Sequence, residues 1–104
     1  IVDSGIDDDI IPSKFSVSSA FPNPFNGRVA LDISIAEIQP ISFMITNVLG
    51  QVVYQNTLLP TRAGKFQISW NGKDLMQKEL PSGIYLYSVK TNKYITSGKF
   101  TYLK

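Results

Sequence analysis

The sequence contains no cysteine and no histidine in its 104 residues. Without them the chain has no disulfide, no thiol or imidazole nucleophile with its base, and no Cys/His zinc site. It also lacks the run of roughly 20 apolar residues that a membrane-spanning helix needs, and a basic start followed by an apolar segment. We therefore expect no enzyme, no cofactor, no metal site, no membrane span and no N-terminal export signal in this stretch.

Charged residues are few, at 17%, and hydrophobic residues make up 43%. This composition is typical of a globular chain, and 104 residues leave room for one domain. The chain begins Ile-Val-Asp with no initiator methionine. We therefore expect an upstream domain in the same polypeptide, and any signal peptide would stand at the start of that longer chain.

The two charge signs are distributed unevenly along the chain. Residues 1–13 hold four acids, Asp3, Asp7, Asp8 and Asp9, and no base, whereas all ten bases lie in residues 14–104. The aspartates lack the D-x-D-x-D-G spacing of a calcium loop, so a flexible acidic linker is the better interpretation of 1–13. The bases are scattered singly, which favours a solvated surface and no nucleic-acid partner.

Apolar and polar residues alternate over most of residues 14–104, and no helical period occurs. Alternation with period two is typical of strands with one buried face, and apolar residues on both faces of 83–91 predict a central strand. Gly98 in the last segment predicts a β-bulge. We expect an all-β fold, an immunoglobulin-like antiparallel β-sandwich of about seven strands. The predicted strands are 15–18, 28–35, 41–45, 51–58, 64–70, 83–91 and 94–103.

Two features admit both a structural and a ligand-binding interpretation. Pro22 and Pro24 fix the backbone of a rigid bend before the first long strand, and turning the chain is a sufficient reason for them. Trp70 could stack on a sugar, but it continues the inward face of Phe66 and Ile68. We expect a structural bend and a core tryptophan.

Four short motifs follow one another along the chain, and they are Phe21-Pro22-Asn23-Pro24-Phe25-Asn26, Val48-Leu49-Gly50-Gln51-Val52-Val53, Trp70-Asn71-Gly72-Lys73-Asp74 and Pro81-Ser82-Gly83-Ile84-Tyr85. In this order they resemble the motifs of the type A C-terminal sorting domains of the type IX secretion system in Bacteroidetes. The resemblance covers residues 14–104 and includes Lys99 and Lys104 near the end. Phe21 stands where the family usually has tyrosine, and Gly27 where many members have proline.

The resemblance implies a non-catalytic sorting domain over residues 14–104. Its cargo would reach the periplasm by a signal peptide and cross the outer membrane through a translocon that recognises the domain, and it would end secreted or on the cell surface. In many members a surface peptidase then removes the domain, which implies a cut in or near the linker before Phe15. The implied translocon-recognition residues are Gly83, Tyr85, Lys99 and Lys104.

A second hypothesis is an immunoglobulin-like accessory module that binds carbohydrate or protein for an attached secreted enzyme. It depends on the same fold and on the aromatic content of 12%. Specific retention on a glycan array or in a pull-down, lost on Trp70→Ala without unfolding, would favour this second hypothesis.

Overall fold

The computed structural model describes residues 14–104, so the predicted linker over residues 1–13 lies outside the described residues. The described chain contains seven strands, one for each predicted segment. No observed bound differs from the predicted one by more than one residue. The strands are β1 (Ser16–Val17), β2 (Val29–Ile35), β3 (Ile41–Thr46), β4 (Val52–Leu58), β5 (Gly64–Trp70), β6 (Gly83–Lys90) and β7 (Ile95–Tyr102).

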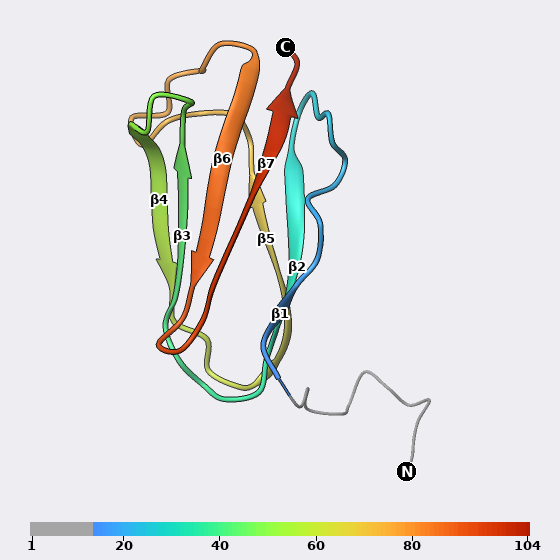
Figure 1. Cartoon of the computed structure of the whole chain (residues 1–104), viewed down its shortest axis with the longest axis vertical. Coiled ribbons are helices and arrows are strands. Elements are labelled where there is room, and N and C mark those ends of the chain that lie inside the picture. Colours follow the sequence, from blue (N-terminus) through green and yellow to red (C-terminus); the bar gives the residue numbers. More distant parts are fainter. Residues whose placement is uncertain (1–13) are drawn as a thin grey trace.

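The strands form two antiparallel sheets packed face to face (Figure 1). One has three strands in the order β1-β2-β5 and the other has four in the order β4-β3-β6-β7. Sequential hairpins alone would place β5 beside β4, but β5 pairs with β2 in the opposite sheet over seven residues. This exchange between sheets is typical of immunoglobulin-like sandwiches. The predicted fold class is confirmed.

The alternation of side chains sets which residues lie between the sheets. Every second residue of β2 is buried, because one face of the strand packs on the opposite sheet. The prediction that β6 is a central strand is confirmed by its place between β3 and β7. On the outer face of β6, however, Ile84 is 47% and Leu86 39% exposed. The apolar side chains on this second face therefore form an exposed patch and are not buried. The largest fully buried side chains are Phe25, Phe43, Phe100, Leu31, Ile33, Ile35, Ile41, Ile45 and Val89.

The predicted bulge at Gly98 is wrong. The register of β6 and β7 runs without a shift from Gly83 opposite Tyr102 to Lys90 opposite Ile95. Gly98 lies opposite Tyr87, and a Cβ at Gly98 would come within 2.5 Å of the Tyr87 hydroxyl oxygen. The glycine therefore makes room for a tyrosine ring across the strand pair and does not interrupt the pairing.

The two ends of the sandwich differ in what they carry. β1 lies at one end, and the C-terminus lies at the other (Figure 1). Successive strands run in opposite directions. The bend before β2, the β3–β4 turn and the β5–β6 loop therefore all lie at the end with the C-terminus. We call this the motif end, because it is made of residues 21–28, 47–51, 71–83 and 101–104. All four sequence motifs reach it, although residues 27–80 lie between the first motif and the last.

Candidate functional site

A cluster of buried aromatic rings joins the motifs at the motif end. Phe25 of the proline bend stacks on Tyr102 of β7, with ring centroids 4.9 Å apart. Trp70 packs edge-on against Tyr85 at 5.4 Å and is stacked on Phe100 at 5.6 Å. Trp70 is only 2% exposed, so the expectation of a core tryptophan is confirmed. Its ring is not available to stack on a sugar.

Tyr85 lies inside this cluster and is only 4% exposed. Its hydroxyl donates a 2.6 Å hydrogen bond to the carbonyl of Pro81, four residues upstream. A tyrosine near the start of such a strand that bonds back to the chain is the tyrosine corner of immunoglobulin-like domains. Burial, and secondarily the nearby Tyr102, raise the pKa of the Tyr85 hydroxyl. Tyr85 therefore holds the 81–85 corner from inside and presents no ring to solvent.

The other three predicted recognition residues are divided between two places. Gly83 opens β6 at the motif end, opposite Tyr102. Lys104 lies beside it, because its backbone amide donates to the Ser82 hydroxyl at 2.9 Å. Lys99 is exposed in the middle of β7, opposite Leu86 on the outer face of the four-stranded sheet. The structure therefore brings Gly83 and Lys104 together and places Lys99 lower on the same sheet.

The Lys104 ammonium lies 3.5 Å from the Glu79 carboxylate, and both side chains are well exposed, at 43% and 60%. An exposed ion pair of this kind contributes little to stability. The charge of Lys104 therefore remains accessible from solvent. The exposed Lys99 and Lys104 are the two cations of the predicted set that a partner can reach directly.

Asn23 and Asn26 are functional candidates that sequence reasoning missed, because the bend was interpreted only as a turn. Asn23 accepts the Thr101 amide at 2.9 Å, and its side-chain nitrogen donates to the Lys99 carbonyl at 3.4 Å. Asn26 donates to the Leu103 carbonyl at 2.7 Å. Amide side chains next to prolines were the available signal, since asparagine can replace backbone partners where proline lacks a donor.

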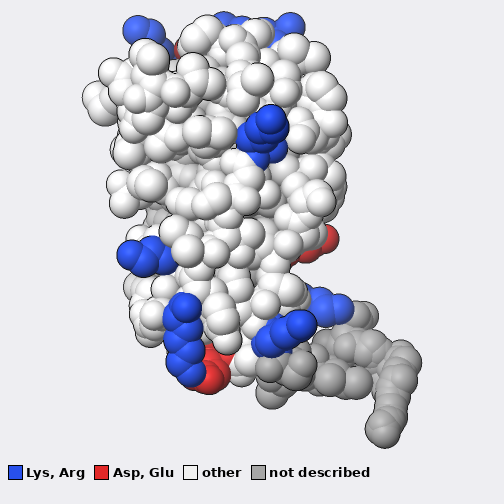
Figure 2. Space-filling model, in the orientation of Figure 1, with Lys and Arg blue, Asp and Glu red and all other residues white. Residues whose placement is uncertain are grey.

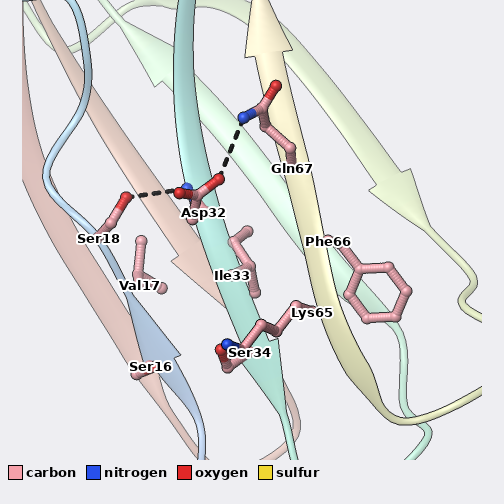
Figure 3. A pocket seen from close by; sticks show the side chains of 9 residues that line it. All are labelled: Ser16, Val17, Ser18, Asp32, Ile33, Ser34, Lys65, Phe66 and Gln67. Atoms are coloured by element: carbon pink, nitrogen blue, oxygen red, sulfur yellow. Dashed lines mark hydrogen bonds between the residues drawn. The ribbon is translucent and has the colours of Figure 1, made fainter. Parts of the chain in front are cut away.

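The outer face of the three-stranded sheet carries a shallow polar hollow (Figure 3). Asp32 lies in it, but its carboxylate accepts a hydrogen bond from Gln67 at 3.1 Å, and its amide donates to the Ser18 hydroxyl. Ile33 lies in the buried core, and Phe66 packs against that core. No second carboxylate faces Asp32 there, as acid-base hydrolysis would need. Residues 14–104 also hold no cluster of three potential metal ligands.

The remaining acids of the described chain are engaged or exposed at loops. Asp74 accepts the amides of Met76 and Lys78, each at 2.9 Å, and so shapes the β5–β6 loop. Figure 2 shows a largely uncharged face with basic side chains scattered singly over it. The strands β3, β4, β6 and β7 carry two lysines, Lys90 and Lys99, and no acid. The four-stranded sheet is therefore apolar and mildly basic.

Several apolar side chains at the motif end are exposed. Leu49 in the β3–β4 turn is 80% exposed and Met76 in the β5–β6 loop 86%. Exposed apolar groups in loops that shape a rigid end are typical of interaction surfaces.

Among residues 14–104 the structure contains no helix that is long and apolar enough to span a membrane.

Comparison with solved structures gives the fold again. PorZ of Porphyromonas gingivalis, described as an essential bacterial surface component of the type-IX secretion system, is 21% identical, with a TM-score of 0.56 over 86% of this chain and 11% of its own. Dimeric latent PorU from the same organism is 18% identical, with a TM-score of 0.65 over 94% of this chain and 10% of its own. The chain thus matches about a tenth of each.

A likeness at this level of identity shows the fold alone, since FlgD of Xanthomonas campestris, described in connection with hook capping in flagellar assembly, has a similar score. It is 20% identical, with a TM-score of 0.57 over 88% of this chain and 63% of its own. Comparison with curated protein sequences gives no significant match.

The family comparison is decisive. The family model described as secretion system C-terminal sorting domain matches residues 19–102, which include all four motifs and most of the described sandwich. The chain therefore belongs to the family of secretion system C-terminal sorting domains, and it is a sorting signal of the type IX secretion system.

Proposed function

We propose that this non-catalytic domain is recognised, in its folded form, by the outer-membrane translocon that exports the attached cargo. The observation that supports this is the gathering of all four motifs and the C-terminal lysine at one end of a rigid sandwich. The cargo reaches the periplasm first, then crosses the outer membrane, and ends secreted or on the cell surface. A surface peptidase cleaves near the linker before Phe15.

The roles of the four recognition residues follow from their placement. Lys99 and Lys104 contact the translocon directly, since both are exposed cations. Gly83 leaves an uncrowded surface at the start of β6 beside Lys104, since nothing lies within 4 Å of the place that its Cβ would take. Tyr85 acts as a positioning residue, since its buried hydroxyl fixes the Pro81 carbonyl and with it the corner that precedes Gly83.

The cargo and the motif end lie on opposite sides of the domain under this proposal. β1 is the first described strand and lies at the far end from the C-terminus (Figure 1). The principal axis of the described chain measures 47 Å. A cargo joined before β1 would therefore be held away from the motif end, which leaves that end free for the translocon.

The test is export of a periplasmic reporter fused to residues 1–104 in a host with a type IX system. The unaltered domain should carry the reporter outside the cell. Lys99→Gln combined with Lys104→Gln should lower export by about tenfold, the equivalent of ~1.4 kcal/mol of binding. Lys14→Gln combined with Lys65→Gln removes the same charge from elsewhere on the domain and should leave export unchanged. Failure of the unaltered domain to export the reporter would contradict the proposal.

A further inference from the structure

The outer edge of β7 is divided into a covered half and an open half. In an antiparallel strand the backbone groups of successive residues point alternately to either side. The Thr101 amide and carbonyl point away from β6, because they bond to Asn23 and to the Phe25 amide. By the same alternation the backbone groups of Ser97 and Ile95 also point outward.

The covered half is closed by the chain itself. Phe25 forms a parallel bridge with Tyr102, in which the Phe25 amide donates to the Thr101 carbonyl at 2.9 Å and the Leu103 amide donates to the Phe25 carbonyl at 2.8 Å. The Asn23 amide group adds two more contacts with the same edge, to Thr101 and Lys99. Residues 23–26 therefore act as a short strand laid along the last third of β7. We call them the clasp.

The open half begins where the clasp ends. Within the described chain, no hydrogen bond engages the outward amides of Lys99, Ser97 and Ile95. Exposed sheet edges are usually blocked by proline, by a bulge or by a covering segment. Residues 95–99 contain no proline, and the register of β7 has no shift. Apart from the Lys99 carbonyl, which Asn23 binds, the outward backbone groups of residues 95–99 are thus unpaired, beside a stretch that already accepts an added strand.

The charge around this edge indicates the kind of partner. Lys99 and Lys90 are exposed on β7 and β6, and no acid lies on the strands of this sheet. The acid that pairs with Lys93 is not part of the sheet, since Glu37 belongs to the β2–β3 connection and lies 3.6 Å from the Lys93 ammonium. A strand with acidic or uncharged side chains would therefore meet favourable charge, whereas a basic one would be repelled.

We propose that residues 95–99 of β7 receive an extended acidic or neutral strand of the outer-membrane export machinery, added end to end with the clasp. This inference rests on the proposed function and names the surface that performs it. Main-chain hydrogen bonds would supply affinity, and the flanking Lys99 would supply selectivity for acidic side chains. The clasp limits the added strand to the lower half of β7.

β4, the other edge of the same sheet, provides the matched control. In each strand the backbone groups of alternate residues point to one neighbour and the rest to the other side. Followed through the registers of β7, β6, β3 and β4, this alternation places the Gln55 amide on the outer edge of β4, just as the Ser97 amide lies on the outer edge of β7. Both side chains are exposed. β4 has no charged residue, and its pairing with β3 shifts register between Ile45 and Thr46, which bends its first part.

The first experiment compares Ser97→Pro with Gln55→Pro in the reporter export assay. Each substitution removes one outward amide and no ladder hydrogen bond, as proline is tolerated on edge strands. We expect Ser97→Pro to lower export by about tenfold. Gln55→Pro should export like the unaltered domain. Equal export by all three would overturn strand addition while leaving the proposed function intact, and no export by the unaltered domain would overturn both.

A second experiment leaves the sheet intact, in case a proline variant does not fold. A photo-crosslinking amino acid replaces Ser97 or Gln55 in the exported fusion, and adducts are compared by mass. Position 97 should yield an adduct with an envelope protein whose deletion blocks export of the reporter, several-fold above position 55. Equal yields at the two positions, or an adduct of twice the mass of the fusion, which would indicate a second copy of this chain, would overturn the proposal.

Discussion

The ring of Tyr102 lies in the space that a side chain at Gly72 would need. A Cβ at residue 72 would come within 2.6 Å of the Tyr102 Cζ atom, and Gly72 has a φ of +79°. The glycine is therefore required both by its left-handed backbone and by the approach of a buried ring. This contact joins the Trp70–Asp74 motif to the last strand of the chain.

Gly72→Ala should destabilise the domain by about 2 to 4 kcal/mol, because left-handed backbone strain adds to the displacement of the Tyr102 ring. Urea unfolding followed by tryptophan fluorescence measures the change, since the indole of Trp70 lies within the same cluster. Gly27→Ala is the control: no atom lies within 4 Å of a Cβ there. Similar losses in the two variants would contradict the role assigned to Tyr102.

Tyr85→Phe should cost about 1 to 2 kcal/mol, because it removes the hydrogen bond to the Pro81 carbonyl and leaves that carbonyl without its partner. Chemical denaturation measures the loss. Tyr94→Phe is a matched change at a ring that is 51% exposed, and its effect should stay within about 0.5 kcal/mol. If Tyr85→Phe is as stable as the unaltered domain, the corner does not depend on this bond.

The stability of the domain should fall at alkaline pH. Burial raises the pKa of the Tyr87 hydroxyl above the ordinary tyrosine value of 10.0 and does the same at Tyr85, where Tyr102 adds to the effect. Below that pH both tyrosines are protonated whether the chain is folded or not, so stability is complete. Above it the unfolded chain releases these protons first, and stability is lost as the pH rises toward the folded pKa.

Tyr87→Phe provides the measurement. In urea titrations over a series of alkaline pH values, the variant should lose less stability per pH unit than the unaltered domain, because one of the two groups no longer titrates. Comparison of each protein with its own stability at neutral pH removes any constant effect of the substitution. An unchanged slope would show that Tyr87 does not contribute to the alkaline loss.

The alternation of side chains was enough to predict the strands and the buried side of β2 and β5. Trp70 illustrates this, since its face follows from Phe66 and Ile68, four and two residues earlier, because side chains alternate between faces with period two. The same local information failed at Gly98. A glycine in a strand is compatible with a bulge or with a large neighbour across the pair, and only the pairing with Tyr87 distinguishes them.

The candidate site was predicted less completely, because its contacts join residues far apart in the chain. Tyr85 belongs to a motif whose sequence does not determine whether the tyrosine ring faces a partner or the core. Asn23 was assigned to a bend, yet its partners Lys99 and Thr101 are 76 and 78 residues away. Hydrogen bonds of this span depend on which strands become neighbours, and that pairing is not written in local periodicity.

The clasp itself gives the last prediction. Asn23→Ala removes the acceptor of the Thr101 amide and should cost about 1 kcal/mol. Hydrogen exchange resolved by residue should show faster exchange at Thr101, while the amide of Phe100, which points into the pairing with Tyr85, should keep most of its protection. Asn92→Ala, in the β6–β7 turn, changes an asparagine whose side chain has no such role and should leave Thr101 unaffected.

Asn23→Ala also tests whether the clasp keeps the unpaired edge of β7 short. If the clasp is loosened, the outward groups of Thr101 and Leu103 join those of residues 95–99, and the exposed edge lengthens. A longer unpaired edge favours association between copies. Asn23→Ala should therefore form dimers or larger species at lower protein concentration than the unaltered domain, as measured by sedimentation velocity. Identical sedimentation of the two proteins, together with unchanged exchange at Thr101, would show that the clasp does not guard this edge.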